Sequence, residues 1–334
     1  MIALPPFRLH RPSTVGEAAR LLSEHRGSAQ VLAGGTDLLV NLRQGLSTPD
    51  HLIALAGVSG LDRIECSLEN GLVVGALTTL DVLASDPAVE ELFPVVSKAA
   101  RTISGPTLRA MGTVGGNLCL DTRCHWYNQS HFWREACGFC LKKDGTVCHV
   151  APGSSLCWAA YSGDLAPAFL VLGAELTIES VRGERQVALD RFFLDDGLKK
   201  YDLAPDEIVT RVRVGPDRAG LRGAYEKLRV RGSLDFPLAG VATAARIGPD
   251  GTFRDVAMAL TAVGPRPFLV EGATELLEGV RADDGDAIER VAHLARRVSN
   301  PMRTTWSMQP AYRRLRTGLF ARDALREIGG EGER

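Results

Sequence analysis

A cysteine-rich stretch between residues 117 and 164 constrains this chain more than any other feature. It lacks the apolar periodicity of a helix or a strand, and irregular segments of this length are uncommon inside a domain unless they are functional or disordered. Its aromatic residues, which include three tryptophans, argue against disorder. We therefore predict that it folds around a metal held by thiolates. Six of the seven cysteines lie in it: Cys119, Cys124, Cys137, Cys140, Cys148 and Cys157.

The spacing leaves two metal centres open. Tetrahedral zinc takes Cys and His ligands, and Cys137-Gly-Phe-Cys140 followed by Cys148-His149 offers both. An iron-sulfur cluster takes four cysteines, and a zinc ribbon would need a second CxxC pair that is not present. A disulfide framework needs an oxidising compartment, to which the N-terminal sequence gives no signal.

Composition excludes several classes of partner. The chain has 334 residues, 45% of them hydrophobic, with 39 Lys and Arg against 40 Asp and Glu. The balanced charge provides no field for nucleic acid or an anionic membrane, and no apolar run has the length of a transmembrane helix. We expect a cytoplasmic, globular protein with no nucleic-acid or membrane partner.

The first half of the chain alternates short strands and helices. A helix is expected to begin at Ser13-Thr14, followed by a strand at 30–33, a glycine turn at Gly34–Asp37 and a helix at 38–42. A second glycine turn at 111–118 directly precedes the cysteine segment. Such turns can hold phosphate through backbone N–H groups, although an ordinary tight turn has the same composition. Two of them together suggest a ligand with two phosphates.

The second half changes character near residue 215. Before it, a hairpin is expected between 175–179 and 185–189. After it, we expect three strands followed by helices at 274–277 and from 286 to 297, which is typical of an α+β unit. The basic run Arg313-Arg314-Leu315-Arg316 is expected on a solvated helix face. No Ser-His-Asp order or HExxH motif supports hydrolase chemistry.

Four motifs follow one another along the chain. The first two are the glycine turns, Val31–Leu38 and Thr113–Leu118. The others are Ser162–Pro167 and, in the C-terminal part, Lys227–Arg229 with Asp235–Ala239. In this order they resemble the medium, FAD-binding subunit of the molybdenum hydroxylases, which include the xanthine and carbon monoxide dehydrogenases.

The cysteine segment departs from that pattern. In ordinary members the third motif follows the second closely, whereas here 47 positions separate Asn117 from Asp164, far more than a normal connection. The insertion contains Asp121-Thr122-Arg123-Cys124, Tyr127-Asn128-Gln129-Ser130 and Cys140-Leu141-Lys142. With these runs it resembles the beta subunit of 4-hydroxybenzoyl-CoA reductases, which carries a 4Fe-4S cluster in addition to FAD. The resemblance implies four cluster ligands: Cys124, Cys140, Cys148 and Cys157. Cys119 and Cys137 match no ligand position, and Cys66 is expected in the core.

The resemblance also implies a fold and a domain division. It predicts an α+β protein with a two-subdomain α/β FAD-binding domain of the vanillyl-alcohol-oxidase/PCMH type at 1–215, divided near residue 57. The iron-sulfur loop is inserted at 119–160. Residues 216–334 would form a C-terminal domain of the carbon monoxide dehydrogenase flavoprotein type, with a three-stranded antiparallel sheet and helices.

Cofactors, partners and residue roles follow from the same resemblance. This chain would transfer electrons and have no catalytic residue of its own, since molybdopterin and 2Fe-2S clusters lie in a large and a small partner subunit. The implied assembly is a dimer of heterotrimers fed by a ferredoxin-like donor, and the implied reaction is reductive removal of the phenolic hydroxyl of 4-hydroxybenzoyl-CoA, in aromatic compound degradation. The alternatives are the FAD subunit of an oxidative molybdenum hydroxylase acting on an aromatic or N-heterocyclic substrate, and a flavin scaffold with structural zinc. The implied FAD contacts are Leu32, Ala33, Gly34, Gly35, Thr36, Asp37, Leu38, Thr113, Gly115, Gly116 and Asn117, with Asp164 at the ribose and Lys227 near the flavin.

Overall fold

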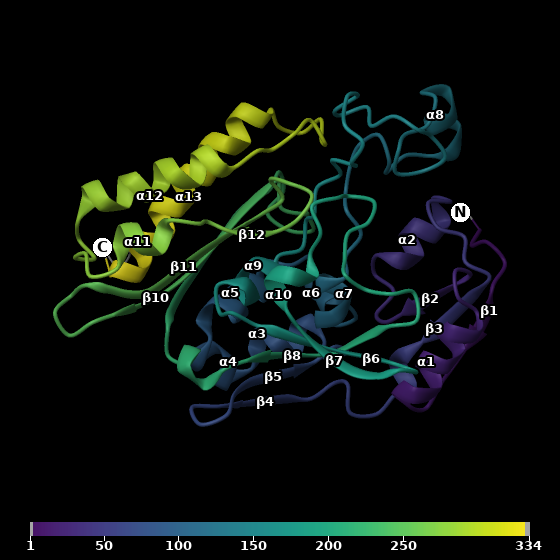
Figure 1. The fold of residues 1–334 in the computed structure, drawn as a ribbon, viewed down its shortest axis with the longest axis horizontal. Coiled ribbons are helices and arrows are strands. Elements are labelled where there is room, and N and C mark those ends of the chain that lie inside the picture. The colour runs from purple at the N-terminus through teal and green to yellow at the C-terminus, as the bar shows by residue number, and fades with distance from the viewer. Residues whose placement is uncertain (1–2, 331–334) are drawn as a thin grey trace.

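The first of three sheets is small and parallel (Figure 1). The computed structural model describes residues 3–330. Strands β1 (Arg8–His10), β2 (Ala29–Leu32) and β3 (His51–Ala54) lie in the order β1-β3-β2. Helix α1 (Val15–Glu24) connects the first two, and its cap is Thr14, whose side chain accepts a hydrogen bond from the Glu17 amide at 3.1 Å. The helix buries its alanine and leucine face against β3.

The second sheet is antiparallel and larger. Its order is β4-β5-β8-β6-β7, with β4 at Ile64–Ser67, β5 at Gly71–Gly75, β6 at Glu175–Ser180, β7 at Gly183–Ala188 and β8 at Ile208–Val214. Short helices pack beside it and share its core. They are α3 (Leu80–Ser85), α4 (Pro87–Leu92), α5 (Pro94–Arg101), α9 (Leu165–Leu170) and α10 (Leu189–Phe192).

The third sheet and three helices form the C-terminal part. The sheet order is β12-β11-β10-β9, with β9 at Arg222–Leu228, β10 at Ala239–Ile247, β11 at Phe253–Thr261 and β12 at Phe268–Leu269. Helices α11 (Ala273–Leu277), α12 (Gly285–Val298) and α13 (Pro310–Gly329) cover one side (Figure 1). The sheet therefore has four strands where the sequence predicts three. The fourth has only two residues and follows Pro265 and Pro267, so it carries no readable period.

The inserted segment stands out from the body beside α2 (Leu38–Arg43), in the teal part of Figure 1 that carries α8 (His131–Ala136). The yellow segment before α13 reaches towards it, and the His125 amide donates to the Thr304 carbonyl at 2.9 Å. The remaining short helices are α6 (Pro106–Arg109), α7 (Val114–Leu118) and the 3-10 turns η1 (Leu55–Gly57) and η2 (Pro216–Arg218).

The predicted α+β architecture is confirmed, as are helix α1, the β6–β7 hairpin and helix α12. Strands β1, β4 and β8 are not predicted from the sequence; β1 and β4 have only three and four residues and depend on their partners. One surface prediction is wrong. Arg313 is 1% exposed and donates to the carbonyls of Leu238, Met302 and Ala262, so it connects α13 to the sheet.

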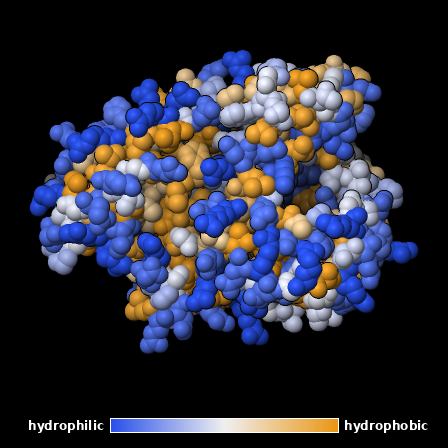
Figure 2. Space-filling view, in the orientation of Figure 1, coloured by the Kyte–Doolittle hydropathy of each residue, from blue (hydrophilic) through white to orange (hydrophobic). Residues whose placement is uncertain are grey.

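The surface in Figure 2 is hydrophilic over the outer parts of the molecule, with apolar residues gathered mainly towards the middle of this face. Within residues 3–330, no helix has the length and apolarity required to cross a bilayer.

Candidate functional site

Both glycine turns line one cavity of about 720 Å³. The first turn connects β2 to α2 and the second turn leads into α7, so the cavity lies where the first two sheets meet. Leu32 and Lys227 are not part of its wall. The predicted residues that line it are Ala33, Gly34, Gly35, Thr36, Asp37, Leu38, Thr113, Gly115, Gly116, Asn117 and Asp164.

The first turn has backbone donors to offer. Among the described residues, no protein acceptor bonds the amides of Gly34, Gly35 or Thr36. Gly35 has φ +74°, which favours glycine, and a Cβ on Gly34 would lie 1.7 Å from the Met111 carbonyl oxygen. The two turns are therefore in backbone contact, and free N–H groups at the first one suit a phosphate.

The backbone amides of the second turn already have protein acceptors. The Gly115 amide donates to the Ala76 carbonyl at 2.8 Å, and the Gly116 and Asn117 amides donate to the Thr113 hydroxyl and carbonyl at 3.1 and 2.9 Å. The Asn117 side-chain oxygen accepts from the Leu165 amide at 3.1 Å. We therefore expect most amide contacts with a phosphate to come from the first turn, while the second supports its position.

Asp164 and Lys227 are paired with each other. The Lys227 ammonium lies 3.1 Å from the Asp164 carboxylate, and both side chains are under 5% exposed. Lys227 also donates to the Thr102 carbonyl at 3.0 Å, and the Tyr225 hydroxyl donates to Asp164 at 2.7 Å. Burial raises the pKa of Asp164, although the Lys227 ammonium opposes that shift. This pair joins the C-terminal sheet to the cavity wall.

The start of the insertion is anchored on the first glycine turn. Arg123 forms an ion pair with Asp37, and its guanidinium lies 4.1 Å from the centre of the Phe236 ring. Burial raises the pKa of Asp37, and the positive charge of Arg123 opposes the rise. One arginine thus connects the turn, the insertion and the C-terminal part.

Asp121 is the second anchor. Its carboxylate accepts from Lys142 at 2.9 Å, Lys200 at 2.5 Å and the Tyr127 hydroxyl at 3.0 Å. Burial alone would raise the pKa of Asp121, but the two ammonium groups hold it well below its usual range. Tyr127, Lys142 and Asp121 also line the cavity, so the insertion forms part of its wall. The sequence alone predicts none of these contacts, because Lys142 and Lys200 lie 21 and 79 positions from Asp121 along the chain.

The four predicted ligand cysteines are the four buried ones. Cys124, Cys140, Cys148 and Cys157 are each 5–7% exposed, whereas Cys119, Cys137 and Cys66 are half-buried. Cys124, Cys140 and Cys157 belong to one packed cluster with Tyr127 and Leu46, and Cys148 is within electrostatic reach of Cys124 and Cys157.

Burial and the neighbouring thiols raise the pKa of Cys124 to about 12, while burial is the main cause that raises the pKa of Cys157 to about 11. Four thiolates at such a site need a cation among them.

The four sulfurs do not form a close ligand group among the described residues. Zinc–sulfur bonds of about 2.3 Å place tetrahedral thiolates about 3.8 Å apart. Among residues 3–330, three or more ligand atoms of His, Cys, Asp or Glu lie within 4.8 Å of one another at His10, His25 and His51 alone, so no three of these sulfurs are that close. Four cysteines are the donor set of an iron-sulfur cluster, and tetrahedral zinc accepts the same four thiolates.

The two histidines of the insertion have other contacts. His149 contacts the Phe139 carbonyl through Nε2, and the His125 ring lies with its centre 4.0 Å from that of Trp306, the planes tilted by 42°. Within residues 3–330, neither ring forms a close ligand group with the cysteines.

Comparison with known proteins gives matches along the whole chain. A family model for the FAD binding domain in molybdopterin dehydrogenase matches residues 5–216, and one for the CO dehydrogenase flavoprotein C-terminal domain matches residues 223–328.

Curated relatives match over most of their length. The aldehyde oxidoreductase FAD-binding subunit PaoB of Escherichia coli is 32% identical over 83% of this chain and 87% of the relative. The carbon monoxide dehydrogenase medium chain of Hydrogenophaga pseudoflava is 29% identical over 89% of this chain and 88% of its own length. In a solved carbon monoxide dehydrogenase from that organism, one chain superimposes with a TM-score of 0.80 at 26% identity, covering 98% of this chain and 99% of that one.

Proposed function

Because this chain belongs to the family of FAD-binding domains of molybdopterin dehydrogenases, we propose that it is the electron-transfer subunit of a molybdenum hydroxylase complex and that it holds one 4Fe-4S cluster in addition to FAD. The observation that carries the cluster is the burial of four cysteines in a loop that also lines the cavity of the glycine turns. The fold is the family's FAD-binding domain of the PCMH type followed by its C-terminal domain.

FAD supplies the exchange between one- and two-electron transfer when bound. In the proposed site, the free amides of Gly34, Gly35 and Thr36 hold the pyrophosphate, and Thr113 and Asn117 fix the second turn against them. Leu32 ends the strand that supports the first turn. We propose Asp164 for the adenosine ribose and Lys227 as the cation that keeps Asp164 ionised, while its assignment beside the flavin remains a prediction.

The cluster ligands in this proposal are Cys124, Cys140, Cys148 and Cys157. Lys142 is 6% exposed and lies near Cys157, so its positive charge is available to offset the negative charge of the thiolate-bound cluster. Cys137 shares its CxxC motif with Cys140 but is not buried with the other thiols.

For the direction of electron flow we propose the reductive reaction of a 4-hydroxybenzoyl-CoA reductase. A reduced ferredoxin would donate electrons, and the substrate would react in a large molybdopterin subunit assembled with a small 2Fe-2S subunit as a dimer of heterotrimers. The support is the insertion, whose runs 121–124, 127–130 and 140–142 resemble that reductase.

A second candidate is an oxidative molybdenum hydroxylase, in which electrons leave through this chain. The names of the relatives favour it, since they include an aldehyde oxidoreductase, a carbon monoxide dehydrogenase and a nicotinate dehydrogenase. Reconstitution with the partner subunits discriminates between the two. Turnover of 4-hydroxybenzoyl-CoA with reduced ferredoxin supports the reductase, and flavin reduction by an aldehyde or N-heterocycle supports the oxidative enzyme.

The cofactor content tests the part that both candidates share. Protein purified without oxygen should contain about four iron, four sulfide and one FAD per chain, with a paramagnetic signal after dithionite reduction. Zinc without sulfide would instead make the loop a structural zinc site on a flavin scaffold, the third possibility, and would remove the cluster from the proposal.

A further inference from the structure

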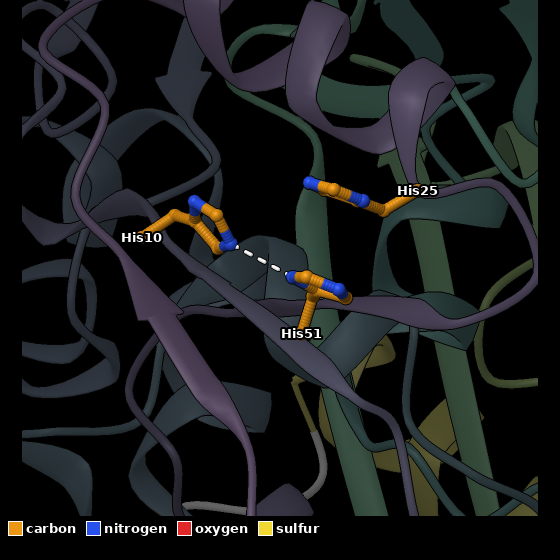
Figure 3. A group of neighbouring side chains, drawn as sticks. All are labelled: His10, His25 and His51. Atoms are coloured by element: carbon orange, nitrogen blue, oxygen red, sulfur yellow. Dashed lines mark hydrogen bonds between the residues drawn. The ribbon is translucent and has the colours of Figure 1, made fainter.

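Three histidines that lie far apart in the sequence meet on the small parallel sheet (Figure 3). His10 ends β1, His51 begins β3 and His25 follows the last turn of α1. The pairing of β1 with β3 brings the first two together across 41 positions, and the His10 Nε2 and His51 Nδ1 atoms are 2.9 Å apart. The helix end places His25 against His51, with ring centres 3.7 Å apart and planes at 6°.

The three rings have few other partners. Apart from the contact between His10 and His51, no hydrogen bond or ion pair to these ring nitrogens occurs within residues 3–330. Each side chain is partly exposed, so solvent and ions can reach the group. Nearby charges are the Arg8 guanidinium and the Asp50 carboxylate, which act in opposite directions on His51. The pKa of His51 is lowered, mainly by burial and then by the neighbouring His25 and His10.

We propose that His10, His25 and His51 form a binding site for a late first-row divalent cation such as Zn²⁺, separate from the FAD and cluster sites. One nitrogen from each ring lies within 4.8 Å of the others, and neutral imidazole is a preferred ligand of these cations. Zinc–nitrogen bonds of about 2.0–2.1 Å require nitrogens about 3.4 Å apart, and His25 and His51 must rotate out of their parallel stack so that their in-plane lone pairs converge on the cation. Water or a partner's side chain fills the fourth position.

A cation bound to the three histidines would connect three secondary-structure elements. A cation bound there fixes β1 and the end of α1 to β3, and β3 pairs with β2, which leads into the first glycine turn. Zinc should therefore raise the thermal unfolding temperature of the protein, because a cation that binds the folded state stabilises it.

The test is equilibrium dialysis of the complete, cofactor-loaded chain against Zn²⁺. The variants are His51→Gln, His25→Gln and the control His293→Gln, which removes an exposed histidine on α12. Wild type and His293→Gln should bind one more zinc per chain than His51→Gln, and His25→Gln should bind that zinc at least about 10-fold more weakly. Equal zinc in wild type and His51→Gln would overturn the proposal.

X-ray absorption of the additional zinc identifies its ligands. Distances of about 2.0–2.1 Å indicate nitrogen ligands as proposed, whereas about 2.3 Å indicates thiolates and overturns the assignment. Unchanged FAD content in His51→Gln shows that the variant folds. A zinc-induced rise in unfolding temperature that is lost in His51→Gln and kept in His293→Gln supports the proposed connection of β1, α1 and β3 by the cation.

Discussion

Replacing Gly34 with alanine tests the joint between the two glycine turns. The new Cβ would lie 1.7 Å from the Met111 carbonyl oxygen, 2.7 Å from its carbon and 3.2 Å from the Gly112 Cα, all backbone atoms. Since non-bonded atoms prefer separations near about 3.5 Å, the turns must move apart by about 1.5–2 Å. Forced packing of this kind costs about 1–3 kcal/mol of stability.

FAD binding should suffer more than folding. Hydrogen bonds to a charged group contribute about 1.5–3 kcal/mol each, so misplacing two of the free amides weakens binding by about 3–6 kcal/mol, or at least about 100-fold. The assay is a fluorescence titration of flavin-free protein with FAD, together with thermal unfolding.

A matched control is Gly16→Ala in α1, where a Cβ meets no atom within 4 Å. That variant should gain up to about 1 kcal/mol of stability and bind FAD normally. Wild-type FAD affinity in Gly34→Ala would refute the assignment of this turn as the phosphate site.

Three further predictions concern the connections around the cavity. Lys227→Met leaves the buried Asp164 carboxylate without its cation and should cost about 3–5 kcal/mol in urea unfolding, and Lys227→Met with Asp164→Asn should recover part of that loss; no recovery would show that the pair is not coupled. Asp121→Asn removes the carboxylate that pairs with the buried Lys142 and should lower the free energy of unfolding by about 3 kcal/mol. Because the folded pKa of Asp121 is lowered, its contribution is complete above the unfolded pKa of about 3.9 and is lost only below it, so unfolding at pH 7 should separate wild type from variant and strongly acidic pH should not. Deleting residues 124–157 should leave a folded protein that still binds FAD, and global unfolding by circular dichroism would show that the loop belongs to the core.

The local sequence predicts those elements whose signals are local. The cap at Thr14 defines α1, and the β6–β7 hairpin follows from two alternating runs on either side of a short turn. Arg313 shows the limit, since nothing in a basic helical run tells that one arginine will be buried beneath three carbonyls from other elements.

Some parts of the candidate site can likewise be predicted from the sequence, and others arise only from the fold. The glycine turns and the cysteine loop are visible in the sequence, and the structure places both turns and the loop on one cavity. Cysteine spacing alone does not select four ligands from six, because selection depends on which thiols the folded loop buries. The Asp164–Lys227 pair and the His10–His51 contact join residues 63 and 41 positions apart, and such contacts arise only from the packing of the sheets.

The most direct test of the central claim compares Cys140→Ser with Cys137→Ser. Both cysteines belong to one CxxC motif, but only Cys140 is buried with the other thiols. Iron, sulfide and FAD are measured on both variants and on wild type, all purified without oxygen. We predict that Cys140→Ser loses iron and sulfide and keeps FAD, while Cys137→Ser keeps all three. Equal loss of iron from both variants would contradict the ligand set, and wild-type protein with zinc and no sulfide would contradict an iron-sulfur subunit altogether.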